Sequence, residues 1–522
     1  MDFNLKPLDF GAVRRLLERL TISPYGADAA RALEPAPSLA DARRRSDAVT
    51  AAVGALAAHA VPRFGQVPDV RAALRQAEHP GAALNPQALA NLRALQRLGD
   101  EMGTLAAAHP GLLPEFAALA GEPALAAALD RVVSAAGRLK DDASDALREL
   151  HGEAHRLRGE AQRIVVGRAT KPDAVSLVLE PERPRWHGAR AVLALRADAA
   201  DAVKGVRRGT GAGGREVLLE PLEAVAVNNR LEALDGKIQS ETQAVLRATT
   251  DRVRSAAPAI WRLTEAVAEL DLALAAGRLA LAMDAHAPDL VDEPVVDLRR
   301  ARHPLLVAAQ ESTGGAPVTP LDLRLDAERP LLVITGPNMG GKTVALKTVG
   351  LLTLMALAGL HVPAAAGSRI GWFTRVAVDI GDHQSLQHHL STFAGHVEVL
   401  KGVLASADAA TLVLLDELGT GTDPDEGAAL AMAVLDELAS RGVRGVVTTH
   451  LPRLKAFADS HAQLCNASMR FDDETLSPTY ELVVGRPGRS LGLTIAERRG
   501  LPAETVTRAR AYLAAAGSAD LT

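Results

Sequence analysis

The sequence predicts a multidomain protein: a helical core with a coiled-coil arm that carries a small β-containing tip, followed by an α/β domain and a C-terminal pair of helices. Three observations support this fold class. The 522 residues correspond to three or four domains at about 150 residues per domain. The N-terminal half has apolar residues at helical spacing, whereas apolar runs alternate with helical patterns after residue 296. The hydrophobic fraction of 48% and the charged fraction of 23% are typical of globular proteins and exclude a wholly disordered chain.

Residues 1–138 are expected to form a helical core domain. Helical spacing is clear in two places within it: Val13, Leu16, Leu17 and Leu20, and then Leu89, Leu92, Leu95 and Leu98. Turn sequences such as HPGAALNP separate the helical segments.

Residues 139–250 are expected to form two lever helices with a clamp tip at about 165–220. The first helix has apolar residues alternately four and three apart, which is typical of a coiled coil: Leu139, Ala143, Ala146, Leu150, Ala154, Leu157, Ala161 and Ile164. A second stripe has the same period: Val227, Leu231, Leu234, Ile238 and Val245. Between them, the runs VSLVLE, ARAVLALR and REVLLE predict short strands. Residues 251–289 would return to the helical core.

The tip is predicted to bind nucleic acid through basic side chains. From Arg183 to Arg215 the chain has eight Lys or Arg residues against Asp198 and Asp201, a local net charge of +6. The candidate contacts are Lys204, Arg207, Arg208 and Arg215. The alternative interpretation is a solvated loop, which is the commoner meaning of a charge run. The total charge of −5 and the 3% aromatic content favour local phosphate contacts over a globally basic surface or base stacking.

Residues 290–485 are expected to form an α/β domain. The apolar runs PLLVIT, RVAVDI, TLVLLDE and GVVTTH alternate with helical segments, which indicates a mostly parallel sheet. The most apolar stretch, residues 349–360, is too short for a membrane helix and is predicted to be a buried helix. Residues 486–522 contain the closing helix pair, at 491–499 and 502–514.

A phosphate-binding motif lies between the run LLVIT and a helical segment. The sequence GPNMGGKT matches the P-loop pattern, in which glycines allow backbone N–H groups to surround phosphates. Lys342 is expected to reach the β- and γ-phosphates and Thr343 to bind Mg²⁺. The alternative is a chance glycine turn. The predicted nucleotide contacts are Gly336, Pro337, Asn338, Met339, Gly340, Gly341, Lys342, Thr343 and Val344.

Two further strand ends supply candidate catalytic groups. TLVLLDE delivers Asp416 and Glu417 to the edge of the sheet where α/β proteins bind ligands. Asp416 would hold Mg²⁺ and Glu417 would orient the attacking water. GVVTTH places His450 at the end of another strand, where it could sense the γ-phosphate. The alternatives are a solvated acidic turn and a structural histidine. Together with Lys342 these residues predict an ATPase that uses ATP and Mg²⁺.

Other site types are disfavoured. GRSLG around Ser490 fits an esterase motif, but no histidine follows it as that fold requires. The cluster His383, His388, His389 and His396 lacks the spacing of a metal site. A single cysteine, Cys465, and an N-terminus unlike a signal peptide favour the cytoplasm.

Four motifs stand in the order and spacing of one family. They are GPNMGGKT, STFAGH at Ser391–His396, LLDELGTGTDP at Leu414–Pro424 and TTH at Thr448–His450. ARHPLL precedes them, and residues 219–234 resemble the segment where a clamp returns to its lever helix. Over residues 8–515 the chain thus resembles the MutS DNA-repair family and its P-loop ATPase domain of ABC-like fold.

The departures from that family favour one branch. GDHQSLQHHLSTF is most similar to the bacterial second MutS paralogue, the anti-recombination MutS, and no Phe-x-Glu mismatch-reading motif occurs in the first hundred residues. Such proteins usually continue into a small nuclease domain, whereas this sequence stops at Thr522. Nuclease activity is therefore not expected of these residues.

The resemblance implies a homodimer with two composite ATPase sites. Ser391, at a helix N-terminus, would reach the γ-phosphate bound by the other subunit, and the helices after Arg489 would dimerise. Tyr480 would lie over adenine, although a structural strand tyrosine is an equal alternative.

Two partners follow from the resemblance. The first is branched DNA held by a clamp that suppresses recombination. The second is the ribosome, with rRNA contacts, for an ATPase that splits stalled or collided ribosomes. The expected location is the cytoplasm, at the nucleoid or on ribosomes, without membrane association. An SMC- or ABC-type ATPase is disfavoured because the P-loop starts at residue 336, the heptads are short and no LSGGQ-like signature occurs.

Overall fold

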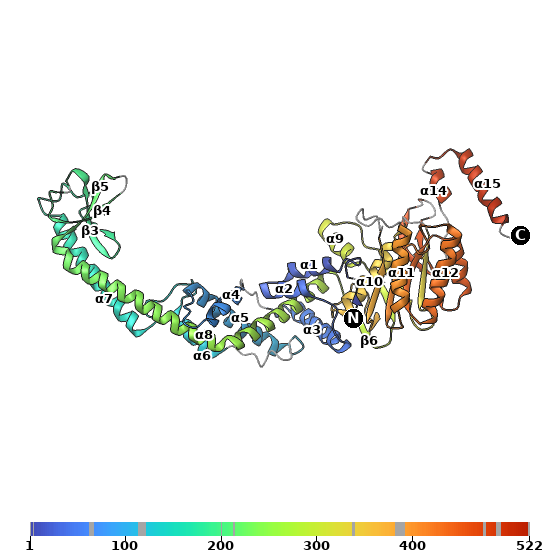
Figure 1. The fold of residues 1–522 in the computed structure, drawn as a ribbon, viewed down its shortest axis with the longest axis horizontal. Coiled ribbons are helices and arrows are strands. Elements are labelled where there is room, and N and C mark those ends of the chain that lie inside the picture. Colours follow the sequence, from blue (N-terminus) through green and yellow to red (C-terminus); the bar gives the residue numbers. More distant parts are fainter. Residues whose placement is uncertain are drawn as a thin grey trace. The chain divides into compact units, whose positions relative to one another are not determined.

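The computed structural model describes most of the chain, in two compact units (Figure 1). The described residues are 2–3, 5–61, 67–112, 122–199, 201–211, 214–336, 340–381, 392–472, 475, 477–486, 492–498 and 500–519. The first unit comprises Met1–Gly65, Thr104–Ala117 and Ala266–Thr522, and the second comprises Gln66–Gly103 and Ala118–Glu265. The domain boundaries expected from the sequence stay predictions.

The second unit is built mainly from helices. Their bounds are α4 Arg71–Glu78, α5 Pro86–Ala108, α6 Pro123–Val132, α7 Asp145–Ala169 and α8 Val225–Ala282, of which α5 and α8 continue into the first unit. The predicted stripe is confirmed in its centre, where Ala154, Leu157 and Ala161 pack with Val227 and Leu231 in one apolar cluster. Figure 1 draws α7 and the first half of α8 side by side.

The start of the predicted stripe is wrong. The helix begins at Asp145, because the Ser144 hydroxyl accepts the N–H of Leu147 as an N-cap. Leu139 lies before this helix and forms an isolated bridge with Val133. In the first turn Leu147 is buried and Ala146 is exposed, so the buried face is shifted by one residue there.

A four-stranded antiparallel sheet lies between α7 and α8 in the chain. Its order is β2-β3-β5-β4, with β2 Arg185–His187, β3 Arg190–Arg196, β4 Gly205–Thr210 and β5 Glu216–Pro221. Two short 3-10 helices accompany it, η2 Ala197–Ala199 and η4 Leu222–Ala224. The strand predicted for VSLVLE is wrong: the N–H groups of Val175 and Val178 bond locally to Lys171 and Ala174, which gives turns and a single bridge from Val178 to Leu195.

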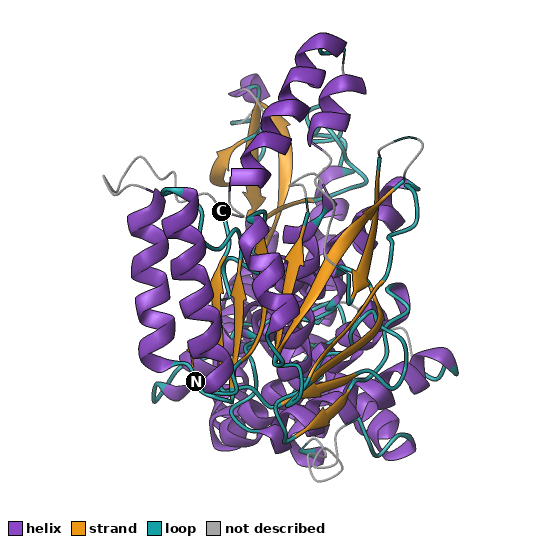
Figure 2. Cartoon of the chain, turned by 90° about the vertical axis from the view of Figure 1, so that its right-hand side faces the viewer, coloured by secondary structure: helices purple, strands orange, loops and turns teal. Residues whose placement is uncertain are grey.

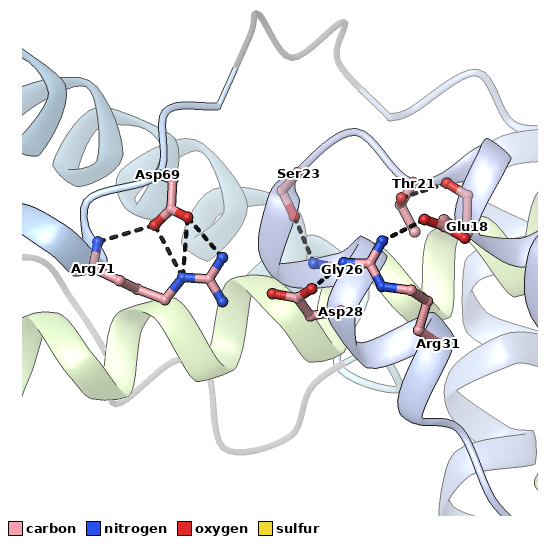
Figure 3. Close-up of polar contacts among 8 residues, drawn as sticks. All are labelled: Glu18, Thr21, Ser23, Gly26, Asp28, Arg31, Asp69 and Arg71. Atoms are coloured by element: carbon pink, nitrogen blue, oxygen red, sulfur yellow. Dashed lines mark hydrogen bonds and ion pairs between the residues drawn. The ribbon is translucent and has the colours of Figure 1, made fainter.

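The first unit starts with a short strand and three helices, which are β1 Asp2–Phe3, α1 Phe10–Leu20, α2 Pro24–Ala32 and α3 Leu39–Ala57. The Ser23 hydroxyl accepts the N–H of Gly26 at 2.9 Å and caps α2, as Figure 3 shows. Arg31 contacts both Glu18 and Asp28 in the same view. Figure 3 also shows the Asp69–Arg71 ion pair, which precedes α4 in the second unit. The Ser23 and Asp69 contacts lie at the starts of α2 and α4, whereas Arg31, in the last turn of α2, links α2 to Glu18 of α1.

A small mixed sheet follows α8. Its order is β6-β10-β7-β8, with β6 Asp289–Val291, β7 Val296–Ala301, β8 Leu321–Leu325 and β10 Arg369–Gly371. Helix α9 Pro304–Thr313 lies between β7 and β8 in the chain.

The main sheet has the order β1-β11-β12-β13-β9-β14-β15. Its other strands are β9 Leu331–Thr335, β11 Arg375–Asp379, β12 Thr411–Leu415, β13 Arg444–Thr449, β14 Leu464–Phe471 and β15 Pro478–Val484. All pairings are parallel except that between β14 and β15. The predicted, mostly parallel sheet is therefore confirmed.

Helices cover both faces of this sheet (Figure 2). They are α10 Lys342–Leu357, α11 Thr392–Ser406, α12 Pro424–Ser440 and α13 Pro452–Ser460, with α14 Gly492–Arg498 and α15 Ala503–Ala519 as the predicted closing pair. Leu332 and Leu414 face the side of α10, whereas Val333 and Val413 pack with residues of α11, α12 and α13. Helix α10 is almost entirely buried, as expected from its composition. Among the described residues, no helix combines the length and hydropathy needed to cross a membrane.

Candidate nucleotide-binding site

The predicted site residues meet at one edge of the main sheet because their strands are parallel neighbours. Strands β12, β13 and β9 lie in this order, and each is followed directly by a predicted functional residue. Gly336 follows β9, Asp416 follows β12 and His450 follows β13. The carboxyl ends of these strands therefore form the common edge where α/β sheets bind ligands.

The glycines of the phosphate loop hold a backbone shape that other residues avoid. Gly336 has φ +130° and Gly341, which precedes α10, has φ +90°. A Cβ on Gly340 would lie 3.0 Å from the Cβ of Met469, and one on Gly341 would lie 3.0 Å from Cδ1 of Tyr480. The chain thus passes close to β14 and β15 at the start of α10, where a helix N-terminus favours anions. Pro337, Asn338 and Met339 lie outside the described residues.

Lys342 is buried, with only 2% of its surface exposed. Its Nζ donates to the carbonyl of Gly336 at 2.7 Å and to that of Thr449 at 3.4 Å. Burial lowers the pKa of this ammonium group, and the negative charges of Glu417 and Asp416 oppose that shift. The contacts hold the lysine across the mouth of the glycine loop, where an anionic phosphate would compensate its buried charge.

Thr343 and Asp416 are in direct contact. The Thr343 hydroxyl donates to Asp416 Oδ2 at 2.8 Å, and the Thr448 hydroxyl donates to Asp416 Oδ1. One hydroxyl and one carboxylate fit Mg²⁺, which usually takes few protein ligands and completes its shell with water and phosphate oxygens. Within the described ranges, no group of three or more His, Cys, Asp or Glu side chains is placed to hold a metal ion.

Glu417 lies in a strained turn that Thr448 fixes from the neighbouring strand. Its φ is +52°, which costs a residue with a side chain about 1–3 kcal/mol. The Glu417 N–H donates to the Thr448 hydroxyl at 2.9 Å, and the Leu418 N–H donates to the Thr448 carbonyl at 3.0 Å. No role was predicted for Thr448, although its place two residues before His450, near the end of a predicted strand, could be read from the sequence.

The remaining nucleotide-site candidates differ in their surroundings. His450 is exposed directly after β13, and Val344 is 42% exposed in the first turn of α10. Tyr480 is 54% exposed beside Gly341, so it is not a buried strand tyrosine. Ser391 lies outside the described residues, immediately before α11.

A buried carboxylate and a histidine beside Asp416 were missed as a pair. Asp379 ends β11, its side chain is 3% exposed, and its Oδ2 lies 2.7 Å from Nδ1 of His396 on α11. The hydrogen bond with Asp379 raises the pKa of His396 against the effect of burial, and the charges of Glu417 and Asp416 add to the rise. A signal was present in the sequence, because an acid, Asp379, directly follows the apolar run VAV of RVAVDI, as Asp416 follows TLVLL.

The predicted nucleic-acid contacts lie in the second unit and have internal partners. Arg208 Nε donates at 2.6 Å to Glu220, which is fully buried, and Arg207 pairs with Asp201. Lys204 and Arg215 are exposed. Acidic residues just outside the stretch counted above reduce the local charge: residues 171–223 hold nine Lys or Arg and eight Asp or Glu, a net charge of +1. The four residues stay predicted contacts: Lys204, Arg207 and Arg215 are exposed, whereas Arg208 is half-buried.

Comparison with known proteins identifies the family. The family described as MutS domain V matches residues 332–516. A protein from Thermomicrobium roseum named endonuclease MutS2 is 40% identical over 98% of this chain and 65% of its own length. Proteins of the same name from Symbiobacterium thermophilum and Pelotomaculum thermopropionicum are each 37% identical over 98% of this chain, and the chain covers 63% and 64% of them. It therefore spans slightly less than two thirds of these relatives. The chain belongs to the MutS family and is most similar to its MutS2 branch.

Proposed function

We propose that the chain is a Mg²⁺-dependent ATPase that acts as a homodimeric clamp on branched DNA and suppresses homologous recombination. The observation that carries the ATPase assignment is the contact between Thr343 and Asp416 at the end of a glycine loop, with Lys342 and Glu417 beside it. This is the set of groups that positions a nucleoside triphosphate, its metal ion and a water molecule.

Each residue has a separate task in this mechanism. The backbone N–H groups of the loop from Gly336 to Gly341 bind the phosphate oxygens; Pro337 has no N–H group and does not contribute. Lys342 offsets the charge on the β- and γ-phosphates. Thr343 and Asp416 would hold Mg²⁺, which supplies charge neutralisation when bound. Glu417 accepts a hydrogen bond from the attacking water and orients it toward the γ-phosphorus.

The supporting contacts explain why the water would be placed accurately. The Thr448 hydroxyl bonds both to the Asp416 carboxylate and to the N–H of Glu417. The same threonine therefore fixes the residue that would hold the metal ion and the residue that would orient the water. Preorganised groups of this kind need little rearrangement at the moment of reaction. His450 would sense the γ-phosphate, Val344 would line the nucleotide and Tyr480 would stack on adenine.

A dimer and a nucleic-acid partner are proposed from the family. Ser391 would complete the site of the other subunit, and α14 and α15 would dimerise. Leu501, Tyr512 and Leu513 are exposed on or beside these helices, which supports an interface there. Helices α7 and α8 would act as the lever and the β2–β5 sheet as the clamp tip. Lys204, Arg207, Arg208 and Arg215 are the proposed phosphate contacts.

Two variants test the ATPase assignment. Lys342→Ala should abolish ATP binding because it removes the cation that offsets the phosphate charge. Glu417→Ala should retain binding but stop turnover because only the water ligand is lost. Fluorescent-nucleotide binding and phosphate release measure the two effects. Equal turnover by Glu417→Ala and the parent would contradict the role of Glu417.

The partner is tested by stimulation of turnover. ATP hydrolysis should rise with four-way-junction DNA more than with linear duplex DNA or ribosomes at the same salt concentration. Lys204→Glu combined with Arg215→Glu should weaken junction binding and reduce its salt dependence, since each lost phosphate contact lowers the slope by about one. A response to ribosomes alone would replace DNA by the ribosome as the partner.

A further inference from the structure

The Asp379–His396 pair lies next to the catalytic turn but has no task in the mechanism above. Asp379 is at the carboxyl end of β11, the neighbour of β12, and its side chain is almost completely buried. His396 comes from α11 and retains 16% of its side-chain exposure. The 2.7 Å separation between Asp379 Oδ2 and His396 Nδ1 is that of a charge-assisted hydrogen bond.

The pair is joined to the catalytic turn through the backbone. The Asp416 N–H donates to the Asp379 carbonyl at 2.8 Å, so the two strand ends are held in register. Residues Asp379, His396, Asp416 and Glu417 also line one small cavity together with apolar residues of α11 and α12. A displacement of His396 would therefore change the surroundings of the Glu417 carboxylate.

Helix α11 also touches the loop that follows Glu417. A Cβ on Gly421 would lie 3.4 Å from the backbone N and Cα of Phe393. Gly421 has φ +87°, a conformation that favours glycine. The backbone of the first turn of α11 thus lies close to the backbone of the loop after Glu417, and the Asp379–His396 bond links this helix to the site.

Three carboxylates lie near the His396 imidazole and influence its charge. Carboxylates face it from the end of β11, as Asp379, and from the turn after β12, as Asp416 and Glu417. The α12 residues of the same cavity, Leu430 and Ala431, carry no charge. These carboxylates raise the pKa of His396, which favours an imidazolium cation.

We propose that His396, fixed by Asp379, is a positioning residue that holds the Glu417 carboxylate in the orientation needed to activate water. The inference rests on the proposed ATPase function and adds to it a group that does not touch nucleotide. Asp379 sets the direction of the imidazole, and the imidazolium charge keeps Glu417 from swinging toward Lys342. Loss of the pair would leave nucleotide binding intact and lower the rate of the chemical step.

Turnover and binding separate this role from a structural one. His396→Gln should lower kcat by about tenfold to a hundredfold, the range expected when a reacting group is misplaced by up to about 1 Å. Its Kd for a fluorescent nucleotide should stay within about twofold of the parent, since uniform binding is untouched. His396→Lys, which keeps the positive charge, should retain more turnover than His396→Gln.

A matched control is available in the same unit. His461 also pairs with a carboxylate, with its Nε2 3.2 Å from Oδ1 of Asp436, at the end of α13. His461→Gln removes a histidine–carboxylate pair whose carboxylate is 69% exposed and which does not line the cavity beside Glu417. It should leave kcat unchanged.

A second readout does not depend on turnover. Histidine-specific isotope labelling allows the His396 imidazole to be titrated by NMR in nucleotide-free protein. The resonance that is missing from the spectrum of His396→Gln identifies His396. Its pKa should be above the ordinary value of about 6.5 and should fall in Asp379→Asn. If Asp379→Asn does not fold, the comparison of His396→Lys with His396→Gln still decides the matter.

The outcomes distinguish two failures. No ATP turnover by the parent would overturn the proposed function itself. Turnover by the parent together with an unchanged kcat in His396→Gln would overturn only the role of His396, as would equal losses of kcat and nucleotide affinity. Equal turnover of His396→Gln and His396→Lys would contradict the claim that a positive charge at residue 396 positions Glu417.

Discussion

At the scale of single residues, His303 has the clearest link between burial and pH. It is 8% exposed at the start of α9, and its Nδ1 has no hydrogen-bond partner among the described residues. Burial lowers the pKa of His303 to about 4, and the charge of Lys347 adds to the shift while Asp9 opposes it. The folded protein thus keeps this imidazole neutral over a range in which an unfolded chain would protonate it.

The sign of the pH effect follows from that difference. Below about pH 6.5 the unfolded chain binds a proton that the folded state does not, so acid favours unfolding until pH falls below about 4. The free energy of unfolding should drop by about 2 kcal/mol between pH 7 and pH 5 from this residue. His303→Leu should remove this part of the drop in urea titrations, whereas His155→Leu, at an exposed position of α7, should not. An unaltered pH dependence in His303→Leu would contradict the assignment.

Residues that act through contacts between different strands and helices were harder to predict than residues of a contiguous motif. Lys342, Thr343, Asp416 and Glu417 could be assigned because a contiguous pattern of residue types encodes them. Thr448 acts by bonding to Asp416 and Glu417 across strands, and such a register cannot be deduced from a single sequence. The Asp379–His396 pair was missed for the same reason, although Asp379 ends a strand that was predicted and His396 lies in a helix that was predicted.

At the scale of elements, Glu220 organises the small antiparallel sheet. This carboxylate lies near the end of β5, is fully buried, and accepts hydrogen bonds from Arg190, Arg208 and Asn228. Burial by itself would raise the pKa of Glu220, but these three bonds prevail and lower it. Strands β3, β4 and β5 and the start of α8 are thus joined at one charge.

Removal of that charge should loosen the sheet. Glu220→Gln leaves Arg190 and Arg208 without their anion, which should cost about 3 kcal/mol, the lower end for a broken buried pair because Arg208 is 31% exposed. Faster amide hydrogen exchange in β3 and β5 measures the effect. Glu223→Gln is the control, since its contacts with Arg168 and Lys171 are longer, at 3.7 and 3.9 Å, and its own side chain is 48% exposed.

The pH dependence of this element has the same sign as that of His303 but lies at lower pH, below the ordinary pKa of a carboxylate. A carboxylate with a lowered pKa contributes stability above its unfolded pKa and loses it as pH falls through its folded pKa. The protection factors of β3 and β5 should therefore fall in acid in the parent and depend less on pH in Glu220→Gln. Protection that is unchanged by the substitution would exclude Glu220 as the organising charge.

Local patterns predicted elements well where hydrogen bonds stay within one element or follow a parallel sheet. The apolar runs of the main sheet and the buried helix α10 were predicted because burial on both faces leaves few alternatives. VSLVLE was not, because the N–H groups of Val175 and Val178 bond within turns despite strand-like composition, and among the described residues only two hydrogen bonds, through Leu177 and Leu179, join the segment to β3. The basic count of the tip also misled, since Glu220 lies five residues after the counted stretch ends at Arg215 and forms ion pairs with two of its arginines, Arg190 and Arg208.

At the scale of the whole molecule, the proposed dimer has a sharp consequence for mixed subunits. If each site takes Lys342 and Glu417 from one subunit and Ser391 from the other, Lys342→Ala and Ser391→Ala damage different halves of it. Equal mixing of the two inactive proteins gives mixed dimers in half of the assemblies, each with one complete site. Turnover should then recover to about a quarter of the parent's, as the symmetry of a two-fold dimer requires.

The matched control uses two defects in the same half of the site. Lys342→Ala mixed with Glu417→Ala leaves every site damaged, because both residues come from the subunit that binds the nucleotide, so turnover should not recover. Phosphate release, measured after the proteins are mixed and given time to exchange subunits, compares the two mixtures directly. Recovery in neither mixture, with subunit exchange verified by mass, would exclude a composite site, and recovery in both would place Glu417 in the opposite subunit from Lys342.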